Sequence, residues 1–347
     1  MSIGSASASS PPASRRSRVG PTPSLARELY LIDGVRLWAK APLAPFTTIG
    51  TGGKASILVT VASTPALVAA LKMLAAAGSP WLCLGAGSNL LVADRGYPGV
   101  VVKLDENFHY VEGLPSRPGP HSQHLTVTVG AGAYLARLAT VAAEVGLSGL
   151  EFACGIPGSV GGGVAMNAGA HEWSLADLAE DVEVASALGV QWMPATRLEW
   201  GYRFCRIPAG SVITAVRLGL TVGDAARILE HHRSLLRARR TTQPRGVRTF
   251  GSVFKNPPGD AAGRLLEAAG LKGVRRGGAE VSTVHANFLV NLGDATTADM
   301  LVLMSLMRQG VYRTSGISLE PEVRLLGTTF PWESALDVSQ GPLDSDG

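Results

Sequence analysis

The stretch Gly155-Ile156-Pro157-Gly158-Ser159-Val160-Gly161-Gly162-Gly163 decides how the rest of this chain is interpreted. Glycine at this density weakens helices and strands, and it lets backbone N–H groups approach a ligand closely. Consecutive N–H groups in turn conformations form a nest for an anion, and the expected anion is the pyrophosphate of a cofactor. A flexible surface linker is the alternative. Apolar residues between the glycines argue against it, because linkers are usually polar and rich in serine.

Composition indicates a globular protein with more than one domain. The chain has 347 residues, of which 46% are hydrophobic and 17% charged, and this length favours two or three domains. The net charge of +4 comes from scattered basic residues. Beyond the amino-terminal tail no basic stripe with interleaved aromatics occurs, which argues against nucleic-acid binding. No stretch of about 18 apolar residues is both uncharged and poor in glycine, so we expect no membrane span.

The cysteines and histidines exclude two further classes of protein. Cys83, Cys154 and Cys205 lie far apart and form no Cys-x-x-Cys motif. This sparse, odd set argues against a disulfide framework and favours a reducing, cytoplasmic location. The 7 histidines lack the spacing of a metal site, so we expect no bound metal. The sequence also contains no Gly-x-Ser-x-Gly elbow and no Walker motif.

Turn residues and apolar periods divide the chain into an α+β arrangement of two domains with polar ends. The ends lack an apolar period and cannot bury enough surface to order themselves, although a misassigned start site would also explain the first of them. An amphipathic helix over 224–240 opens the second domain. We therefore expect a disordered tail at 1–24, a cofactor-binding domain at 25–222 with lobes at 25–105 and 106–222, a second domain at 223–328, and a disordered tail at 329–347.

A second glycine loop, Gly85-Ala86-Gly87-Ser88-Asn89, follows the apolar strand at 81–84. It resembles the start of a Rossmann fingerprint, but the third glycine and the following helix are missing, and a lone Gly-x-Gly is weak evidence for that fold. We interpret it as a phosphate-facing loop between two strands. The cofactor-binding residues predicted from the two loops are Gly85, Gly87, Ser88, Asn89, Gly155, Ile156, Gly158, Ser159, Gly161 and Gly162.

Three places carry residues that could do chemistry. Tyr202-Arg203 follows an apparent strand, Ser252 lies in a loop after Gly251, and Glu322 stands between Pro321 and an apolar strand. Taken singly, each has an ordinary structural explanation, because Arg and Glu are usually exposed and Ser is common in turns. Their order along the chain, together with the two glycine loops, makes a shared site the better interpretation.

Five short motifs in this order resemble one family. They are Leu84-Gly85-Ala86-Gly87-Ser88-Asn89-Leu90-Leu91, Gly155-Ile156-Pro157-Gly158-Ser159-Val160-Gly161-Gly162, Gly201-Tyr202-Arg203, Gly251-Ser252-Val253-Phe254-Lys255-Asn256-Pro257 and Glu320-Pro321-Glu322-Val323-Arg324. From about residue 46 to 327 the sequence resembles the UDP-N-acetylenolpyruvoylglucosamine reductases, the MurB flavoenzymes of bacterial cell-wall synthesis. The resemblance implies a two-lobed FAD-binding domain of the vanillyl-alcohol-oxidase type and a carboxy-terminal α+β substrate domain.

The resemblance also implies a reaction and a set of roles. NADPH reduces a non-covalently bound FAD, and the flavin passes hydride to the enolpyruvyl ether of a nucleotide sugar, giving UDP-N-acetylmuramate. Arg203 is then the cation that stabilises the developing enolate, with Glu322 completing the site. Ser252 stands at the position of the proton donor. Tyr202, Asn256 and Lys272 match substrate-binding positions, and a monomer is expected.

One departure assigns the chain to a subtype. The segment between Arg203 and Ser252 has little room for the extra tyrosine-bearing loop that some members close over the substrate. With Arg239-Arg240-x-x-Gln243-Pro244, the sequence resembles the shorter type, and the residue that covers the diphosphate is left open. Two other functions also stay open: a flavin-dependent oxidase of a sugar or alcohol, and an inactive FAD-binding relative with a structural role.

Overall fold

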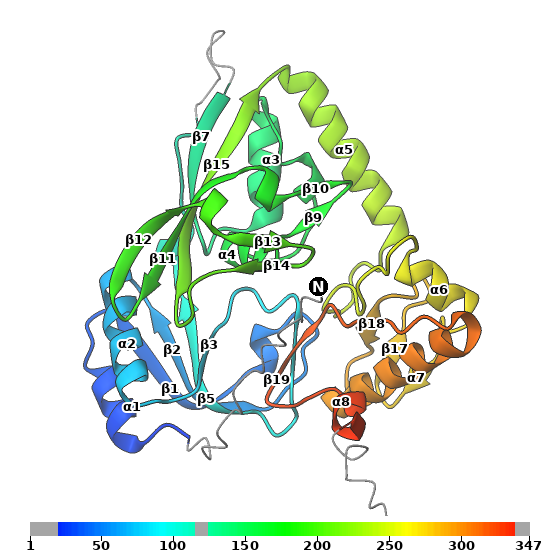
Figure 1. Ribbon diagram of the computed structural model, residues 1–347, viewed down its shortest axis with the longest axis horizontal. Coiled ribbons are helices and arrows are strands. Elements are labelled where there is room, and N and C mark those ends of the chain that lie inside the picture. Colours follow the sequence, from blue (N-terminus) through cyan, green and yellow to red (C-terminus); the bar gives the residue numbers. More distant parts are fainter. Residues whose placement is uncertain (1–19, 115–123, 337–347) are drawn as a thin grey trace, which may run out of the picture.

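The computed structural model describes residues 20–114 and 124–336. Figure 1 shows three bodies: a blue lobe at lower left, a green lobe above it, and a yellow-to-orange domain on the right. We call them lobe 1, lobe 2 and the C-terminal domain. Helix α5 (Ala225–Thr242) runs from lobe 2 toward the C-terminal domain. The expected α+β architecture of two lobes and a further domain is present.

Lobe 1 is a mixed sheet covered by helices. Its order is β1-β2-β5-β3, with β1 antiparallel to β2 and with β2 and β3 parallel to β5. The strands β2 and β5 are apolar on both faces: Val59 and Val102 pack in one core with Leu67 of α2, and Leu58 and Val101 pack in another. The elements are α1 (Pro23–Tyr30), β1 (Val35–Pro42), η1 (Ala44–Phe46), β2 (Lys54–Val61), α2 (Thr64–Ala76), β3 (Trp81–Cys83), β4 (Leu90–Val92), β5 (Tyr97–Leu104) and η2 (Glu106–Phe108).

Lobe 2 is an antiparallel sheet in the order β12-β11-β15-β7-β6, with β8 also paired to β15. Its largest core cluster joins Val129, Val182 and Val216 of the sheet to Leu138 of α3 and Val164 of α4. The elements are β6 (Val111–Glu112), β7 (His124–Gly130), α3 (Leu135–Glu144), β8 (Leu147–Ser148), η3 (Glu151–Ala153), α4 (Val160–Ala165), β9 (Gly169–Ala170), β10 (Trp173–Ser174), η4 (Leu175–Asp177), β11 (Ala179–Ser186), β12 (Gly189–Pro194), η5 (Ala195–Arg197), β13 (Glu199–Gly201), β14 (Phe204–Arg206) and β15 (Val212–Val222).

The C-terminal domain packs helix α7 on a small sheet in the order β16-β17-β18. Met300, Met304 and Met307 of α7 are fully buried against Val281 and Leu289 of that sheet. The elements are α6 (Ala262–Ala268), β16 (Arg275–Arg276), β17 (Ala279–Val281), β18 (Leu289–Asn291), α7 (Thr297–Ser315), β19 (Arg324–Leu326) and α8 (Pro331–Leu336). After α7 the chain returns to lobe 1, where β19 pairs in parallel with β4.

Side-chain hydrogen bonds also fasten the C-terminal domain to lobe 1. The Asp94 carboxylate accepts from the backbone N–H groups of Thr297 and Ala298, at 2.9 Å each, at the start of α7. The Thr297 hydroxyl donates to the Val92 carbonyl at 2.6 Å, and Asn291 Nδ2 donates to the Ile49 carbonyl at 2.9 Å. Lobe 1 and the C-terminal domain are therefore tightly coupled.

The boundaries expected from the sequence are wrong at three places. Helix α5 does not open the second domain: it lies along α3 of lobe 2, with Ile228 and His232 buried. The tail expected at 329–347 contains buried Phe330 and helix α8, because Phe330 and Trp332 stack on each other and pack against the C-terminal core. The tail expected at 1–24 ends in helix α1, which Thr22 caps. The rest of both tails, 1–19 and 337–347, lies outside the described residues.

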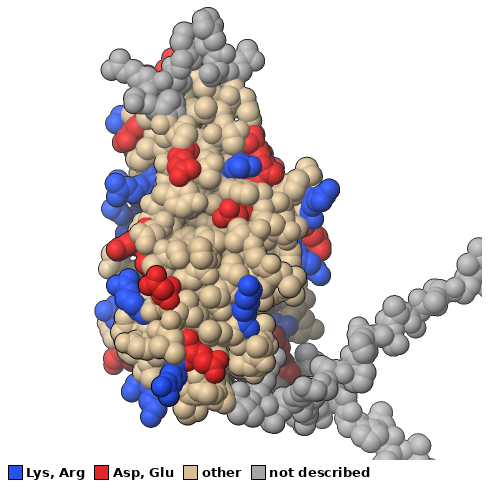
Figure 2. All heavy atoms as spheres, turned by 90° about the vertical axis from the view of Figure 1, so that its left-hand side faces the viewer, with Lys and Arg blue, Asp and Glu red and all other residues tan. Residues whose placement is uncertain are grey.

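The surface over lobe 1 and the outer strands of lobe 2 carries both signs of charge. Figure 2 shows lysine and arginine side chains interspersed with aspartate and glutamate on this face, with no broad patch of one sign. Among the described residues, no helix has the length and the apolar character needed to cross a membrane.

Candidate active site

A cavity of about 610 Å³ is lined by residues of lobe 1, lobe 2 and the C-terminal domain. Both glycine loops contribute to its wall, and so do Arg203, Ser252 and Glu322. The structure thus brings the three predicted catalytic residues and the predicted cofactor loops to one place, although they come from distant parts of the sequence.

The loop at 85–89 follows β3 and is held at both ends. Lys103 Nζ donates to the Gly85 carbonyl at 2.9 Å, and Asn89 Nδ2 donates to the Glu322 carbonyl at 3.2 Å. At Gly87, with φ +66°, a side chain would lie 2.0 Å from the Phe46 carbonyl oxygen, so only glycine fits. The Ser88 hydroxyl donates to the Pro157 carbonyl at 3.0 Å and joins the two glycine loops directly.

The stretch at 155–163 is partly helical, which corrects the expectation of turns alone. Ser159 caps helix α4, its hydroxyl accepting from the Gly162 N–H at 3.3 Å. Glycine is favoured in this helix because its neighbours pack closely: a side chain at Gly163 would contact Leu175 and Leu135 at 3.0 and 3.2 Å. Gly161 packs against Ala131 and does not line the cavity. The other nine predicted cofactor-binding residues do.

Arg203 stands in the two-residue turn between β13 and β14 and pairs with Glu322. Arg203 Nε lies 2.8 Å from Glu322 Oε1, and both side chains are largely buried. Arg203 Nη1 donates to the Gly169 carbonyl at 3.1 Å. Burial raises the pKa of Glu322, and the positive charges of Arg203 and Lys255 partly offset this effect. The pair supplies a fixed cation whose orientation is set by a carboxylate from another domain.

Ser252 lines the same cavity, and a buried asparagine, Asn287, holds the residues that follow it. Asn287 bonds both backbone groups of Phe254, accepting from its N–H at 2.9 Å and donating to its carbonyl at 2.8 Å. The Val253 N–H donates to the Asn287 carbonyl, and Ser252 bridges to Phe288. Within the described part of the chain the Ser252 hydroxyl has no hydrogen-bond partner. Because Ser252 lines the cavity, this hydroxyl is available to donate to a ligand there.

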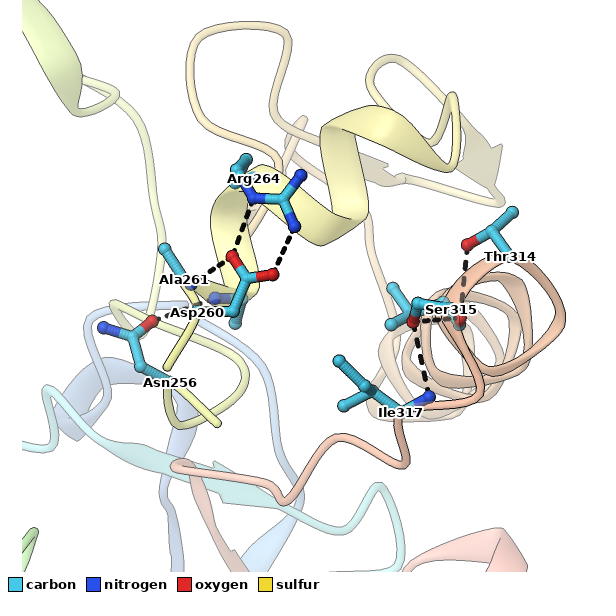
Figure 3. Close-up of polar contacts among 9 residues, drawn as sticks. Asn256, Asp260, Ala261, Arg264, Thr314, Ser315 and Ile317 are labelled. Carbon is cyan, nitrogen blue, oxygen red and sulfur yellow. Dashed lines mark hydrogen bonds and ion pairs between the residues drawn. The ribbon is translucent and has the colours of Figure 1, made fainter. Parts of the chain in front are cut away.

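The three predicted substrate-binding residues lie outside the cavity lining. The exposed Tyr202 hydroxyl accepts from the Asn256 N–H at 3.5 Å. Asn256 Oδ1 accepts from the Ala262 N–H at 3.0 Å at the start of α6, beside the ion pair of Asp260 with Arg264 (Figure 3). Lys272 pairs with Glu267 at 2.7 Å. Substrate binding by these residues stays a prediction.

Sequence reasoning did not assign a role to Arg239, which also lines the cavity. It stands in the last turn of α5, and a side chain at Gly155 would meet Arg239 Cδ at 3.2 Å. Burial lowers the pKa of Arg239, and Arg203 lowers it further. Its guanidinium has no ion-pair partner among the described residues. The sequence signal for Arg239 is the motif Arg239-Arg240-x-x-Gln243-Pro244, which by itself indicates only the subtype.

The cysteines do not form a reactive centre. Burial raises the pKa of Cys83 and of Cys205 to about 11, and it also raises the pKa of Cys154. These thiols therefore stay protonated at neutral pH. No group of three metal-ligating side chains occurs between 20 and 114 or between 124 and 336.

Comparison with known proteins identifies both parts of the chain. Residues 55–192 match the family described as FAD binding domain, and residues 243–326 match the carboxy-terminal domain of UDP-N-acetylenolpyruvoylglucosamine reductase. The second match begins just after α5, in agreement with the packing of α5 on lobe 2.

Whole-chain relatives agree. A UDP-N-acetylenolpyruvoylglucosamine reductase of Anaeromyxobacter sp. (strain Fw109-5) is 49% identical over 83% of this chain and 87% of its own length. That of Myxococcus xanthus is 45% identical over 88% and 96%. The crystal structure of the Thermus caldophilus enzyme is 37% identical and superposes with a TM-score of 0.71 over 84% of this chain and 98% of that one. The expected flavin-binding fold is confirmed, and the chain belongs to the UDP-N-acetylenolpyruvoylglucosamine reductase family.

Proposed function

We propose that this chain reduces UDP-N-acetylenolpyruvoylglucosamine to UDP-N-acetylmuramate, with non-covalently bound FAD and with NADPH as the source of hydride. The observation that carries the proposal is the meeting of Arg203, Glu322 and Ser252 in one cavity with two glycine loops. The family to which the chain belongs supports the substrate.

The residues of the cavity fit FAD. Gly85, Gly87 and Gly158 bring bare backbone to the cavity wall, and Arg239 supplies a cation that lacks an anion. These are the groups that a dinucleotide's phosphates need. Bound FAD would supply a hydride carrier between NADPH and the substrate.

The chain's own residues then stabilise the developing negative charge and donate a proton. Hydride addition to the vinyl ether leaves negative charge spread into the substrate carboxylate, where the Arg203 guanidinium stabilises it. Glu322 holds that guanidinium in place, at 2.8 Å. The Ser252 hydroxyl donates a proton to the adjacent carbon. A serine is a weak acid, so it serves only beside a strongly basic enolate.

A spectroscopic titration tests the function. Purified protein should show flavin absorbance, NADPH should bleach it without oxygen, and the enolpyruvyl nucleotide should then restore it. UDP-N-acetylglucosamine, which lacks the enolpyruvyl group, should not restore it. If oxygen or a simple alcohol substrate restored the absorbance and the enolpyruvyl nucleotide did not, the protein would be an oxidase or a dehydrogenase of another kind.

We further propose that the protein is cytoplasmic, in line with its scattered cysteines and its proposed nucleotide-sugar substrate. We also propose that it is a monomer, as the family resemblance implies. Light scattering after size-exclusion chromatography would give a mass near 36.0 kDa. Twice that mass would contradict the monomer.

A further inference from the structure

Asn167 occupies a backbone position that normally belongs to glycine. It follows Met166, the C-cap of α4, and has φ +40°. Its N–H donates to the Val164 carbonyl at 3.0 Å, and the Ala168 N–H donates to the Gly163 carbonyl at 2.8 Å. These two bonds form a Schellman motif, whose left-handed residue is usually glycine and sometimes asparagine. A stretch that uses glycine at 161, 162, 163 and 169 has asparagine here, which indicates a role for the side chain.

The side chain of Asn167 joins three segments. Its Nδ2 donates to the Gly201 carbonyl at 3.0 Å, and its Oδ1 accepts from the Ala176 N–H at 3.0 Å. The residue is only 9% exposed, and it does not line the cavity. Both polar ends of the amide are therefore used inside the protein, and neither contacts a ligand.

Gly201 begins the turn that carries Arg203. The turn has two central residues, Tyr202 and Arg203, and Arg203 has φ +67°. A left-handed conformation is unfavourable for a non-glycine residue and persists only where surrounding contacts impose it. Asn167 supplies one such contact at the Gly201 carbonyl. Two residues further on, the Gly169 carbonyl accepts from Arg203 Nη1 at 3.1 Å.

We propose that Asn167 is a positioning residue: by holding the Gly201 carbonyl it fixes the turn that aims the Arg203 guanidinium at Glu322 and the substrate carboxylate. The proposal rests on the proposed role of Arg203. Asn167 itself takes no part in proton or hydride transfer.

Two substitutions separate positioning from helix capping. Asn167→Gly relaxes the left-handed backbone and keeps the helix end, but it removes both side-chain bonds, so a role in helix capping alone predicts unchanged activity. Asn167→Asp keeps the acceptor for Ala176 and loses the donor for Gly201. We expect both variants to retain FAD and to be reduced by NADPH at the parent rate. Reoxidation by the enolpyruvyl nucleotide should slow by about 10–100-fold, since a shift of about 1 Å in a catalytic group costs that much.

A double-mutant cycle with Arg203→Ala tests whether Asn167 acts through Arg203. Adding Asn167→Gly to Arg203→Ala should slow reoxidation no further, because the group being positioned is gone. Asn107→Asp is the matched control, since Asn107 Nδ2 also donates to a backbone carbonyl, at 3.0 Å from the Ala62 oxygen, but in lobe 1. It should leave both half-reactions unchanged.

The outcomes are distinguishable. Loss of FAD in both Asn167 variants, equal slowing of both half-reactions, or full additivity with Arg203→Ala would each overturn the positioning role. Normal reoxidation in Asn167→Gly together with slow reoxidation in Arg203→Ala would overturn it as well, while leaving the proposed function intact. Normal reoxidation in Arg203→Ala would instead remove the role of Arg203, and the inference would fail with it.

Discussion

Ser252 separates the two halves of the proposed reaction. A proton donor to the substrate has no part in the oxidation of NADPH, so Ser252→Ala should be reduced at the parent rate. Its reoxidation by the enolpyruvyl nucleotide should fall by about 10²–10⁴-fold, the usual contribution of general acid catalysis. Ser252→Cys should recover part of the loss because a thiol also donates a proton. Stopped-flow absorbance of the flavin measures each half, and an unslowed oxidative half in Ser252→Ala would remove this residue from the mechanism.

Arg239 should affect stability and ligand binding in opposite directions. A partly buried guanidinium without an anion is costly, so Arg239→Met should raise the melting temperature of the flavin-free protein. The same change should weaken binding of FAD or of the nucleotide sugar by tenfold or more, since a charge-assisted hydrogen bond contributes about 1.5–3 kcal/mol. Flavin retention and substrate KM report the two ligands separately. Arg240→Met, at an exposed position of the same helix, is the control, and unchanged affinity for both ligands in Arg239→Met would contradict this role.

Single residues could be predicted from the sequence only where short motifs identify them. Arg203, Ser252 and Glu322 were identified because five motifs occur in order, and the structure brings all three to one cavity. Asn167 could not be identified from the sequence, since its partners lie 9 and 34 residues away and nothing local marks them. Lys272 illustrates the opposite case: the family resemblance implies a role in substrate binding, and the structure pairs it with Glu267 outside the cavity.

At the scale of elements, α5 should make the protein sensitive to acid through His232. Its ring is 2% exposed, and Nε2 lies 3.3 Å from the Thr140 hydroxyl of α3. That hydroxyl also lies 3.0 Å from the Ala136 carbonyl oxygen, and the buried Nδ1 of His232 has no hydrogen-bond partner among the described residues. Burial lowers the pKa of His232 below 6.5, more than Glu151 and Glu144 raise it, and Arg233 and His231 lower it further.

The sign of the effect follows from that direction. Above about pH 6.5 the ring is neutral in both states, and it does not change stability with pH. Below that pH the ring binds a proton in the unfolded chain but stays neutral in the folded chain, where its pKa is lower. The free energy of unfolding therefore falls as the pH falls. Urea unfolding at about pH 8 and pH 5 should show a smaller loss in His232→Leu than in the parent. An equal loss in both proteins would assign the acid sensitivity to other groups.

Elements were predictable where the sequence pattern and the packing agree. The helix at 64–76 begins at a serine cap, Ser63, and the helix at 135–144, which has no side-chain cap, follows an apolar period. Helix α4 was missed because three of its six residues are glycines, which disfavour helices locally. Close packing of α4 against Leu135 and Leu175 overrides that preference and favours glycine at 163, where a Cβ would lie 3.0 and 3.2 Å from those side chains. Tertiary packing of this kind leaves no trace in local composition.

At the scale of the whole molecule, Asp94 should contribute to the cohesion of lobe 1 and the C-terminal domain. Its carboxylate accepts from two N–H groups at the start of α7. Asp94→Ala should lower the free energy of unfolding by about 1–2 kcal/mol, the usual effect of removing a helix cap. Asp94→Asn keeps one acceptor and should lose less. Urea denaturation measures both, and equal stability of Asp94→Ala and the parent would show that the contact contributes nothing.

The pairing of β4 with β19 has a consequence for synthesis on the ribosome. Asn89, next to β4, contacts Glu322, which lies 233 residues further along the chain. At a synthesis rate of roughly 5–20 residues per second, about 10–50 s pass between the synthesis of β4 and that of its partner strand β19. Throughout that interval the nascent chain displays an open strand edge, the feature most prone to intermolecular pairing. A polypeptide that stops short of residue 324 would carry this edge permanently, and such incomplete products are the ones that cellular proteases and chaperones would have to remove.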